Sequence, residues 1–221
     1  KELTMICGID EAGRGPIVGP LVMAGVSVTE DKIELLKAMG IKDSKLIPAE
    51  KREILFDEII KLVDSYDIIE ISAEEIDEYQ ERGINLNQME ARVAAKIINK
   101  LKPSKVYVDS PEPANGGAKF GIMINEFLNV KPEIIAEHGA DAKYVVAGAA
   151  SILAKVSRDR EVARIVEEVG AEIGSGYPHD PRCKAYLADN FRGPIHKYLR
   201  KCWATYKRLN EAQGQSNLSE F

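Results

Sequence analysis

Apolar residues along the 221-residue chain follow two alternating patterns. Short runs of strand length, several of them rich in β-branched residues, lie at 5–9, 21–28, 68–71, 106–108 and 134–136. Apolar residues at helical spacing lie at 48–63, 85–101 and 149–166. A short connection rich in glycine and proline joins the first two runs and predicts a hairpin, whereas the later runs alternate with helices. The pattern therefore predicts a mixed sheet in an α/β layer fold.

The C-terminal part of the chain has a different organisation. The segment GSGYPHDP at 174–181 is turn-like and introduces a helical, basic region. After residue 209 the composition becomes polar, which is typical of a frayed end. We therefore expect an α/β domain at 1–173, a helical region at 174–210 and a flexible tail at 211–221.

Composition restricts the class of protein. A hydrophobic content of 45% is enough for a substantial core, and the sequence has neither an apolar run of membrane-spanning length nor a signal-peptide pattern. The three cysteines show no C-x-x-C spacing, which argues against a disulfide framework or a zinc site. We expect a soluble, cytoplasmic protein without a membrane segment.

Charge is unevenly distributed along the chain. The formal net charge is -5, yet residues 142–221 carry 13 basic and 9 acidic side chains, against 17 and 26 in residues 1–141. Most of the basic excess lies between 182 and 208. This asymmetry favours contact with a phosphate backbone. A solvated helix face remains the alternative.

Acidic residues follow the predicted strands. Asp10 comes directly after the first run and Asp109 after the fourth, while Asp141 precedes the long helical segment. Because α/β sheets build sites at the carboxyl ends of their strands, these acids converge if the two strands are neighbours. Glu11 reaches the same place only if the strand bends, since consecutive side chains face opposite ways.

Clustered carboxylates repel one another unless cations lie between them, and oxygen ligands suit Mg²⁺ or Mn²⁺. Two such ions about 3.5 to 4 Å apart activate a water in phosphodiester hydrolysis. The alternative is that each acid is a solvated turn residue. Glycines at 13, 15 and 19 do not match G-x-G-x-x-G, which disfavours a nucleotide-binding loop.

Six sequence blocks together resemble type 2 ribonuclease H, the ribonuclease HII family. They are GIDEAGRGPIVGP at 8–20, KDSK at 42–45, VYVDS at 106–110, ADAKY at 140–144, AASILAKVSRDR at 149–160 and GSGYPHDPR at 174–182. The resemblance implies a ribonuclease H-like mixed five-stranded sheet flanked by helices, with a C-terminal helical extension that helps to bind substrate. It also implies cleavage of RNA in RNA/DNA hybrids and incision of DNA duplexes 5′ of an embedded ribonucleotide. The expected products carry 3′-hydroxyl and 5′-phosphate ends, and the expected roles are primer removal and ribonucleotide excision repair.

The resemblance also assigns residues to roles. The metal-binding and catalytic acids match Asp10, Glu11, Asp109 and Asp141. The loop Gly13-Arg14-Gly15 matches the segment that contacts the ribose 2′-hydroxyl, which distinguishes RNA from DNA. Tyr177 matches a tyrosine that packs on the sugar beside the scissile phosphate. Histidine 138 is expected to be a surface residue, and tryptophan 203 to belong to the core of the C-terminal helices.

Further blocks of the family contact the nucleic-acid backbone or support the site. They place Lys45, Ser151, Lys155 and Arg158 in these roles. Lys155 and Arg158 are spaced i, i+3 on one helix and are expected to reach one strand together. Ser151, which lies among alanines, is equally consistent with a small packing residue.

The last residues, QSNLSEF, resemble a peptide that binds a replication sliding clamp. Gln215, Leu218 and Phe221 have the Q-x-x-L-x-x-F spacing, although the usual pattern ends in two aromatics. Such a tail on a monomeric, single-chain enzyme favours an archaeal source. Two other classes stay open: a binding module with a degenerate site, and a nuclease or strand-transfer enzyme acting on DNA.

Overall fold

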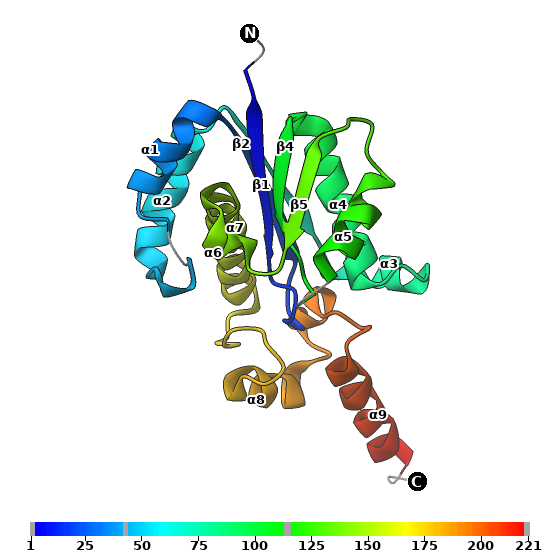
Figure 1. Cartoon of the computed structure of the whole chain (residues 1–221). Helices are drawn as coiled ribbons and strands as arrows, with labels where there is room; N and C mark the ends of the chain where they lie inside the picture. The colour runs from blue at the N-terminus through cyan, green and yellow to red at the C-terminus, as the bar shows by residue number, and fades with distance from the viewer. Residues whose placement is uncertain (1–2, 42–43, 113–115, 219–221) are drawn as a thin grey trace. The chain divides into compact units, whose positions relative to one another are not determined.

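The computed structural model describes residues 3–41, 44–112 and 116–218, with side chains through residue 215. Five strands form one mixed sheet in the order β3-β2-β1-β4-β5 (Figure 1). They are β1 (Met5–Ala12), β2 (Leu21–Thr29), β3 (Ser65–Ile71), β4 (Lys105–Asp109) and β5 (Glu133–Glu137). β1 pairs antiparallel with β2 and parallel with β4, which pairs parallel with β5. The predicted hairpin and mixed α/β sheet are confirmed.

Helices connect the strands and form the C-terminal part of the described chain. The α-helices are α1 (Ile33–Ala38), α2 (Ala49–Leu62), α3 (Ala73–Glu81), α4 (Leu86–Leu101), α5 (Gly116–Asn125), α6 (Ala140–Lys143), α7 (Val145–Val169), α8 (Pro181–Asn190) and α9 (Ala204–Leu218). The 3₁₀ helices are η1 (Glu30–Lys32), η2 (Ser44–Leu46) and η3 (Pro194–Tyr198). Capping boxes at Ser72 and Asn85 begin α3 and α4, because each side chain accepts the third backbone N–H of its helix. None of the helices in the described ranges is long and apolar enough to span a membrane.

Residue contacts divide the chain into two compact units. The first contains Lys1–Ala12, Val22–Glu70 and Asn85–Ser157, and the second contains Gly13–Leu21, Ile71–Ile84 and Arg158–Phe221. The expected division at residue 174 differs from this one. The reason is that the loop after β1 and the second half of α7 pack with the C-terminal residues, as the core of the second unit shows.

The first unit is built around the sheet. On one face, the core is formed by β2, α1, α2 and the first part of α7, with Val26, Ile59 and Ile152 among its buried residues. α4 and α5 cover the opposite face (Figure 1). Glycine at position 8 permits close packing of α7 on β1, because a Cβ there would lie 2.1 Å from the carbonyl carbon of Val146.

The second unit has its own core. Ile17 and Val18, which follow β1, pack with Ile165 of α7 and with Leu187 and Phe191 at the end of α8. The backbone N–H of residue 19 donates to the carbonyl of residue 198 at 2.8 Å, which ties this loop to the end of η3.

The C-terminal segment differs from the expected flexible tail. Residues 211–218 continue α9, whereas the sequence analysis placed the tail from 211 onward. Polar composition suggested fraying, but Glu211, Ala212 and Gln213 are good helix formers that extend a helix already begun at Ala204.

Candidate active site

Asp10 and Asp109 are neighbours because of the register of two parallel strands. Ile9 of β1 pairs with Val108 of β4, and in each strand the next residue is an aspartate. The predicted adjacency of these strands is confirmed, and both acids lie at the edge where α/β sheets build sites. β1 is longer than predicted, because its pairing with β2 continues past Asp10 to Ala12.

Asp141 joins the first two acids through a short helix. Gly139, with a φ of 75°, turns the chain after β5 and begins α6. The backbone N–H of Ala140 donates to Oδ1 of Asp109 at 2.8 Å, which links the start of α6 to the end of β4. As a result, one carboxylate oxygen from each of Asp10, Asp109 and Asp141 lies within 4.8 Å of the other two.

The cluster is electrostatically unfavourable without a cation. Burial, followed by the charges of Glu11 and Asp109, raises the pKa of Asp10 well above its usual value. Burial, followed by Glu11 and Asp141, raises the pKa of Asp109 to about 6, although the N–H of Ala140 acts in the opposite direction. Such mutual repulsion is the signature of acids placed together for a function rather than for stability.

Glu11 lies beside this group of three without being part of it. It follows Asp10 within β1, and a hydrogen bond between the two side chains is among the causes that raise the pKa of Asp10. Its backbone N–H donates to Oδ1 of Asp10 at 2.7 Å, and its charge raises the pKa of both Asp10 and Asp109. A role for Glu11 as a fourth ligand stays a prediction.

The donor set fits a hard divalent cation. Mg²⁺ binds oxygen at about 2.1 Å, so oxygens on opposite sides of one ion lie about 4.2 Å apart. The three carboxylate oxygens, within 4.8 Å of one another, need only small side-chain movements to reach that geometry. All three are carboxylate ligands, which hard cations such as Mg²⁺ and Mn²⁺ prefer over soft metals.

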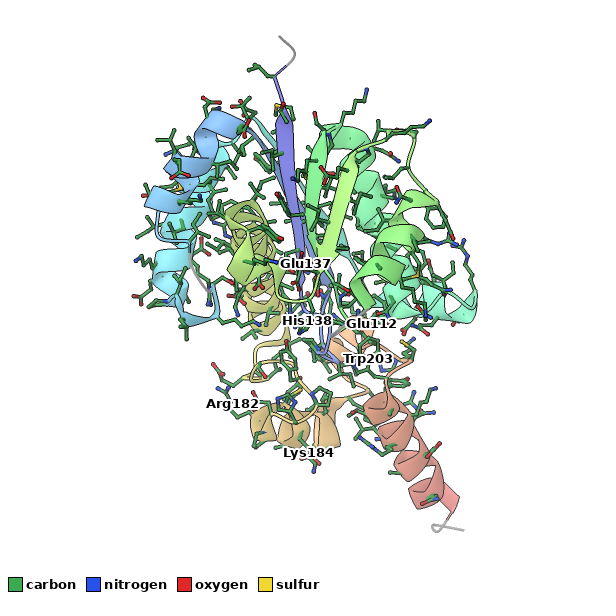
Figure 2. All side chains as sticks on the ribbon, viewed as in Figure 1. Glu112, Glu137, His138, Arg182, Lys184 and Trp203 are labelled. Carbon is green, nitrogen blue, oxygen red and sulfur yellow. The ribbon has the colours of Figure 1, made fainter. Side chains whose placement is uncertain are left out.

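Glu137 is the last residue of β5 and His138 follows it (Figure 2). Glu137 pairs with Asp109 in the sheet. Nδ1 of His138 is 3.3 Å from the carbonyl oxygen of Ser110, and its charge lowers the pKa of Asp109. The carboxylate of Glu137 accepts from Lys143 at 2.8 Å and from the Tyr144 hydroxyl at 3.0 Å. Glu137 is thus engaged in its own ion pair beside the cluster.

Gly13 and Gly15, in the second unit, are held in tightly packed surroundings. Gly13 has a φ of 83°, and a Cβ there would lie 2.3 Å from Cδ of Arg158. Gly15 lies against the ring of Tyr177, since a Cβ on Gly15 would be 3.0 Å from Cε1 of that ring. Tyr177 and the glycines of the predicted recognition segment are therefore brought together by the second unit.

Comparison with known proteins gives the family. The family model for Ribonuclease HII matches residues 7–206. The chain belongs to the ribonuclease HII family. A ribonuclease HII of Thermococcus sibiricus is 46% identical over 222 residues, covering 97% of this chain and 96% of its own. One from Pyrococcus abyssi is 41% identical, covering 97% and 95% respectively.

Solved structures of similar proteins agree with this assignment. The crystal structure of ribonuclease H2 from Pyrococcus horikoshii OT3 has a TM-score of 0.85 at 39% identity, covering 95% of this chain and 98% of its own. The ribonuclease HII chain in the PCNA:RNase HII complex from Archaeoglobus fulgidus has a TM-score of 0.82 at 37% identity, with coverages of 92% and 96%. The ribonuclease H-like fold and the endoribonuclease class are thus confirmed.

Arg158 has different surroundings from those expected for this member of the ribonuclease HII family. Its guanidinium is buried and donates to the carbonyl oxygens of Pro20 at 2.6 Å and Val18 at 3.0 Å. The expectation that Arg158 and Lys155 reach one nucleic-acid strand together is therefore not met for Arg158. Spacing along a helix identifies a shared face, but it does not show that another segment covers part of that face.

The other predicted substrate contacts of the ribonuclease HII chain differ in exposure. Lys45 is exposed in η2, and Lys155 is half-buried on α7. Ser151 is buried, and its hydroxyl lies 2.8 Å from that of Ser44, within the KDSK block. Of the two interpretations of Ser151, the structure therefore favours a supporting residue that holds the Lys45 segment.

Two residues that hold the loop 13–20 were missed by the sequence analysis. Arg200 is fully buried, and its guanidinium donates to three carbonyls, those of Gly13 at 2.5 Å, Arg14 at 2.9 Å and Gly19 at 3.0 Å. Trp203 is half-buried and packs against the core of the second unit, as expected, and it also donates its indole N–H to the carbonyl of Gly15 at 3.0 Å. It precedes α9, as Figure 2 shows. Neither residue lies in a motif that signals such a role.

The proposed clamp motif is only partly described. Gln215 is exposed on α9, and Leu218 is the last residue of that helix. The side chain of Leu218 and the whole of Phe221 lie outside the described part of the chain. Binding of a clamp by these residues stays a prediction.

Proposed function

We propose that this chain is a metal-dependent endoribonuclease with two related substrates. It hydrolyses the RNA strand of RNA/DNA hybrids, and it incises duplex DNA on the 5′ side of an embedded ribonucleotide. The products carry 3′-hydroxyl and 5′-phosphate ends, as primer removal and ribonucleotide excision repair require. The observation that carries the proposal is the cluster of Asp10, Asp109 and Asp141 at the sheet edge of a ribonuclease HII family member.

The catalytic acids in this proposal are Asp10, Asp109 and Asp141 together with Glu11, which would hold Mg²⁺ or Mn²⁺. When bound, the ions supply activation of water and stabilisation of the leaving oxygen. The protein supplies preorganised oxygen atoms. Strand register fixes Asp10 beside Asp109, and the N–H of Ala140 orients the Asp109 carboxylate. This preorganisation spares the enzyme the cost of assembling three repelling charges for each turnover.

Substrate recognition is proposed for the second unit. The Gly13-Arg14-Gly15 backbone and the Arg14 side chain contact the ribose 2′-hydroxyl, and Tyr177 packs on the adjacent sugar. The close packing of the Gly15 backbone against the Tyr177 ring supports a shared role. Lys45 and Lys155 contact backbone phosphates, so binding is indifferent to base sequence and sensitive to salt.

Three end-labelled duplexes test this proposal: an RNA/DNA hybrid, a DNA duplex with one ribonucleotide, and the same duplex without it. We expect Mg²⁺-dependent cutting of the first two, a single cut 5′ of the ribonucleotide, and no cutting in EDTA. Binding of all three without cutting, in Mg²⁺ or Mn²⁺, would instead favour the binding module. Equal cutting of the all-DNA duplex would favour the DNA nuclease.

We also propose that the C-terminal residues Gln215, Leu218 and Phe221 bind a replication sliding clamp. The support is the motif spacing, together with a structural neighbour that was solved as a PCNA:RNase HII complex. Calorimetry with the clamp of the same organism should show binding by the wild type and by Glu211→Ala. The double variant Leu218→Ala, Phe221→Ala should show none, and equal affinities for all three proteins would remove the proposal.

A further inference from the structure

The backbone of the loop 13–20 is held by hydrogen bonds from long side chains that lie far away in the sequence. Six of its carbonyl oxygens accept side-chain hydrogen bonds, namely those of Gly13, Arg14, Gly15, Val18, Gly19 and Pro20. Arg200 and Trp203 donate to the three that belong to Gly13, Arg14 and Gly15. These are the three residues that the proposed function assigns to the ribose.

Burial of the charged Arg200 side chain carries a desolvation cost that a packing role alone does not explain. Arg200 is fully buried, and burial together with the nearby Arg158 charge lowers its pKa. A well-packed apolar side chain fills a buried position without this desolvation cost. A guanidinium adds a rigid fork of donors, and here the fork reaches three separate carbonyls of one loop.

Trp203 holds the third carbonyl of the Gly13–Gly15 segment, which Arg200 does not bind. Its indole N–H donates to the carbonyl of Gly15 at 3.0 Å, and the Arg200 guanidinium lies 4.8 Å from the centroid of its ring. The backbone N–H of Trp203 also donates to the carbonyl of Arg200 at 3.1 Å. The two side chains therefore contact each other and together hold the carbonyls of residues 13–15.

This support determines which way the peptide groups face. In a planar trans peptide, a carbonyl and the following N–H point in opposite directions. Carbonyls of Gly13 and Arg14 that are turned toward Arg200 therefore direct the next N–H groups, those of residues 14 and 15, away from it. Holding the Gly15 carbonyl on Trp203 likewise keeps an acceptor oxygen from turning toward an anionic strand.

We propose that Arg200 and Trp203 are positioning residues that fix the Gly13–Gly15 backbone in the conformation which recognises the ribose 2′-hydroxyl. The inference rests on the proposed function, because it assigns a support to the recognition loop of that function. It extends the recognition machinery to two residues near the C-terminus that do not contact the sugar themselves.

Trp203→Phe is the deciding variant, because it retains an aromatic ring at this position and removes the indole N–H together with the five-membered ring that carries it. Asn190→Ala is its matched control, since Asn190 also donates one side-chain N–H to a backbone carbonyl of the second unit, that of Tyr186 at 2.9 Å. Arg200→Lys, which removes the fork, is a stronger perturbation of a buried residue. Circular dichroism melts identify any variant that fails to fold.

Two quantities are measured in Mg²⁺: kcat/KM on a DNA duplex with one ribonucleotide, and Kd for the all-DNA duplex by fluorescence anisotropy. Loss of one neutral hydrogen bond predicts a fall in kcat/KM of roughly 3- to 10-fold for Trp203→Phe, with Kd for all-DNA unchanged. Asn190→Ala should match the wild type in both, and a folded Arg200→Lys should lose more than Trp203→Phe.

Three results would overturn the inference while leaving the proposed function intact: unchanged kcat/KM for Trp203→Phe, an equal loss of all-DNA affinity, or an equal fall for Asn190→Ala. A wild-type protein that cuts both duplexes, or neither, would overturn the proposed function and this inference with it. The two failures are thus distinguishable by the behaviour of the wild type.

Discussion

Replacing Asp109 with asparagine should make the metal-free protein more stable while abolishing its activity. The substitution removes one negative charge from the acid cluster and keeps the oxygen that accepts from the N–H of Ala140. Burial and the charges of Glu11 and Asp141 raise the pKa of Asp109 from 3.8 to about 6. Above pH 7 the folded protein therefore carries an unfavourable charge that the unfolded chain does not feel.

The size of this effect follows from the pKa difference. The rise to about 6 corresponds to about 3 kcal/mol of destabilisation, at about 1.4 kcal/mol per tenfold change in the proton-binding constant. Asp109 is partly exposed, so solvent screening reduces this to about 1 to 2 kcal/mol. In EDTA at pH 8, Asp109→Asn should therefore unfold about 2 to 8 °C above the wild type.

Mg²⁺ should reverse the order of stability. An ion that binds only the folded state stabilises it by mass action, so the wild type should gain more than the variant. Cleavage should fall roughly 1,000-fold in Asp109→Asn, which corresponds to about 4 kcal/mol of lost transition-state stabilisation. The assays are thermal melts in EDTA and in Mg²⁺, and initial rates on an RNA/DNA hybrid.

Asp64→Asn is the matched control in the same unit. Lys32 and the N–H of Thr29 lower the pKa of Asp64, so neutralising it should destabilise the protein by up to about 1 kcal/mol without affecting cleavage. The reasoning would be refuted if Asp109→Asn melted below the wild type in EDTA, or if it cleaved the hybrid at the wild-type rate.

Two further predictions concern pH and the recognition loop. Because the folded-state pKa of Asp109 exceeds the unfolded value, the metal-free wild type should gain stability as the pH falls from about 7 to about 4. Urea unfolding in EDTA at pH 7.5 and 5 should show a smaller gain for Asp109→Asn, and equal gains would contradict the assignment. Gly13→Ala should lower the melting temperature and should reduce the cleavage rate at least about tenfold, because the new Cβ would lie 2.3 Å from Cδ of Arg158. Gly40→Ala has a similar positive φ but no atom within 4 Å, so it should cost only about 1 to 2 kcal/mol and leave the rate unchanged; equal rates for both variants would refute the argument.

The approach of Asp10 to Asp109 was predictable because the position of each acid depends on a local signal, the end of an apolar run. Asp10 and Asp109 each end an apolar run, and two parallel strands bring such ends to one edge. The contribution of Gly139 was harder to anticipate. Only the structure shows that Gly139, with a φ of 75°, is the residue before α6 and that this turn places Asp141 near the other two acids.

The supports of the recognition loop were not predictable in the same way. Arg158 and Pro20 are 138 positions apart, and Arg200 and Gly13 are 187 apart. Periodicity identifies the face of a helix but not the distant segment that covers it. For this reason Arg158 was expected to contact nucleic acid, and Arg200 was counted only as part of the basic region 182–208.

The most direct test of the account is a crystal of the wild-type protein soaked in Mn²⁺, with an anomalous difference map. The account predicts a peak roughly 2 Å from carboxylate oxygens of Asp10, Asp109 and Asp141. A protein that cleaves hybrids in Mn²⁺, yet binds the ion elsewhere and leaves these three acids without a peak, would contradict it.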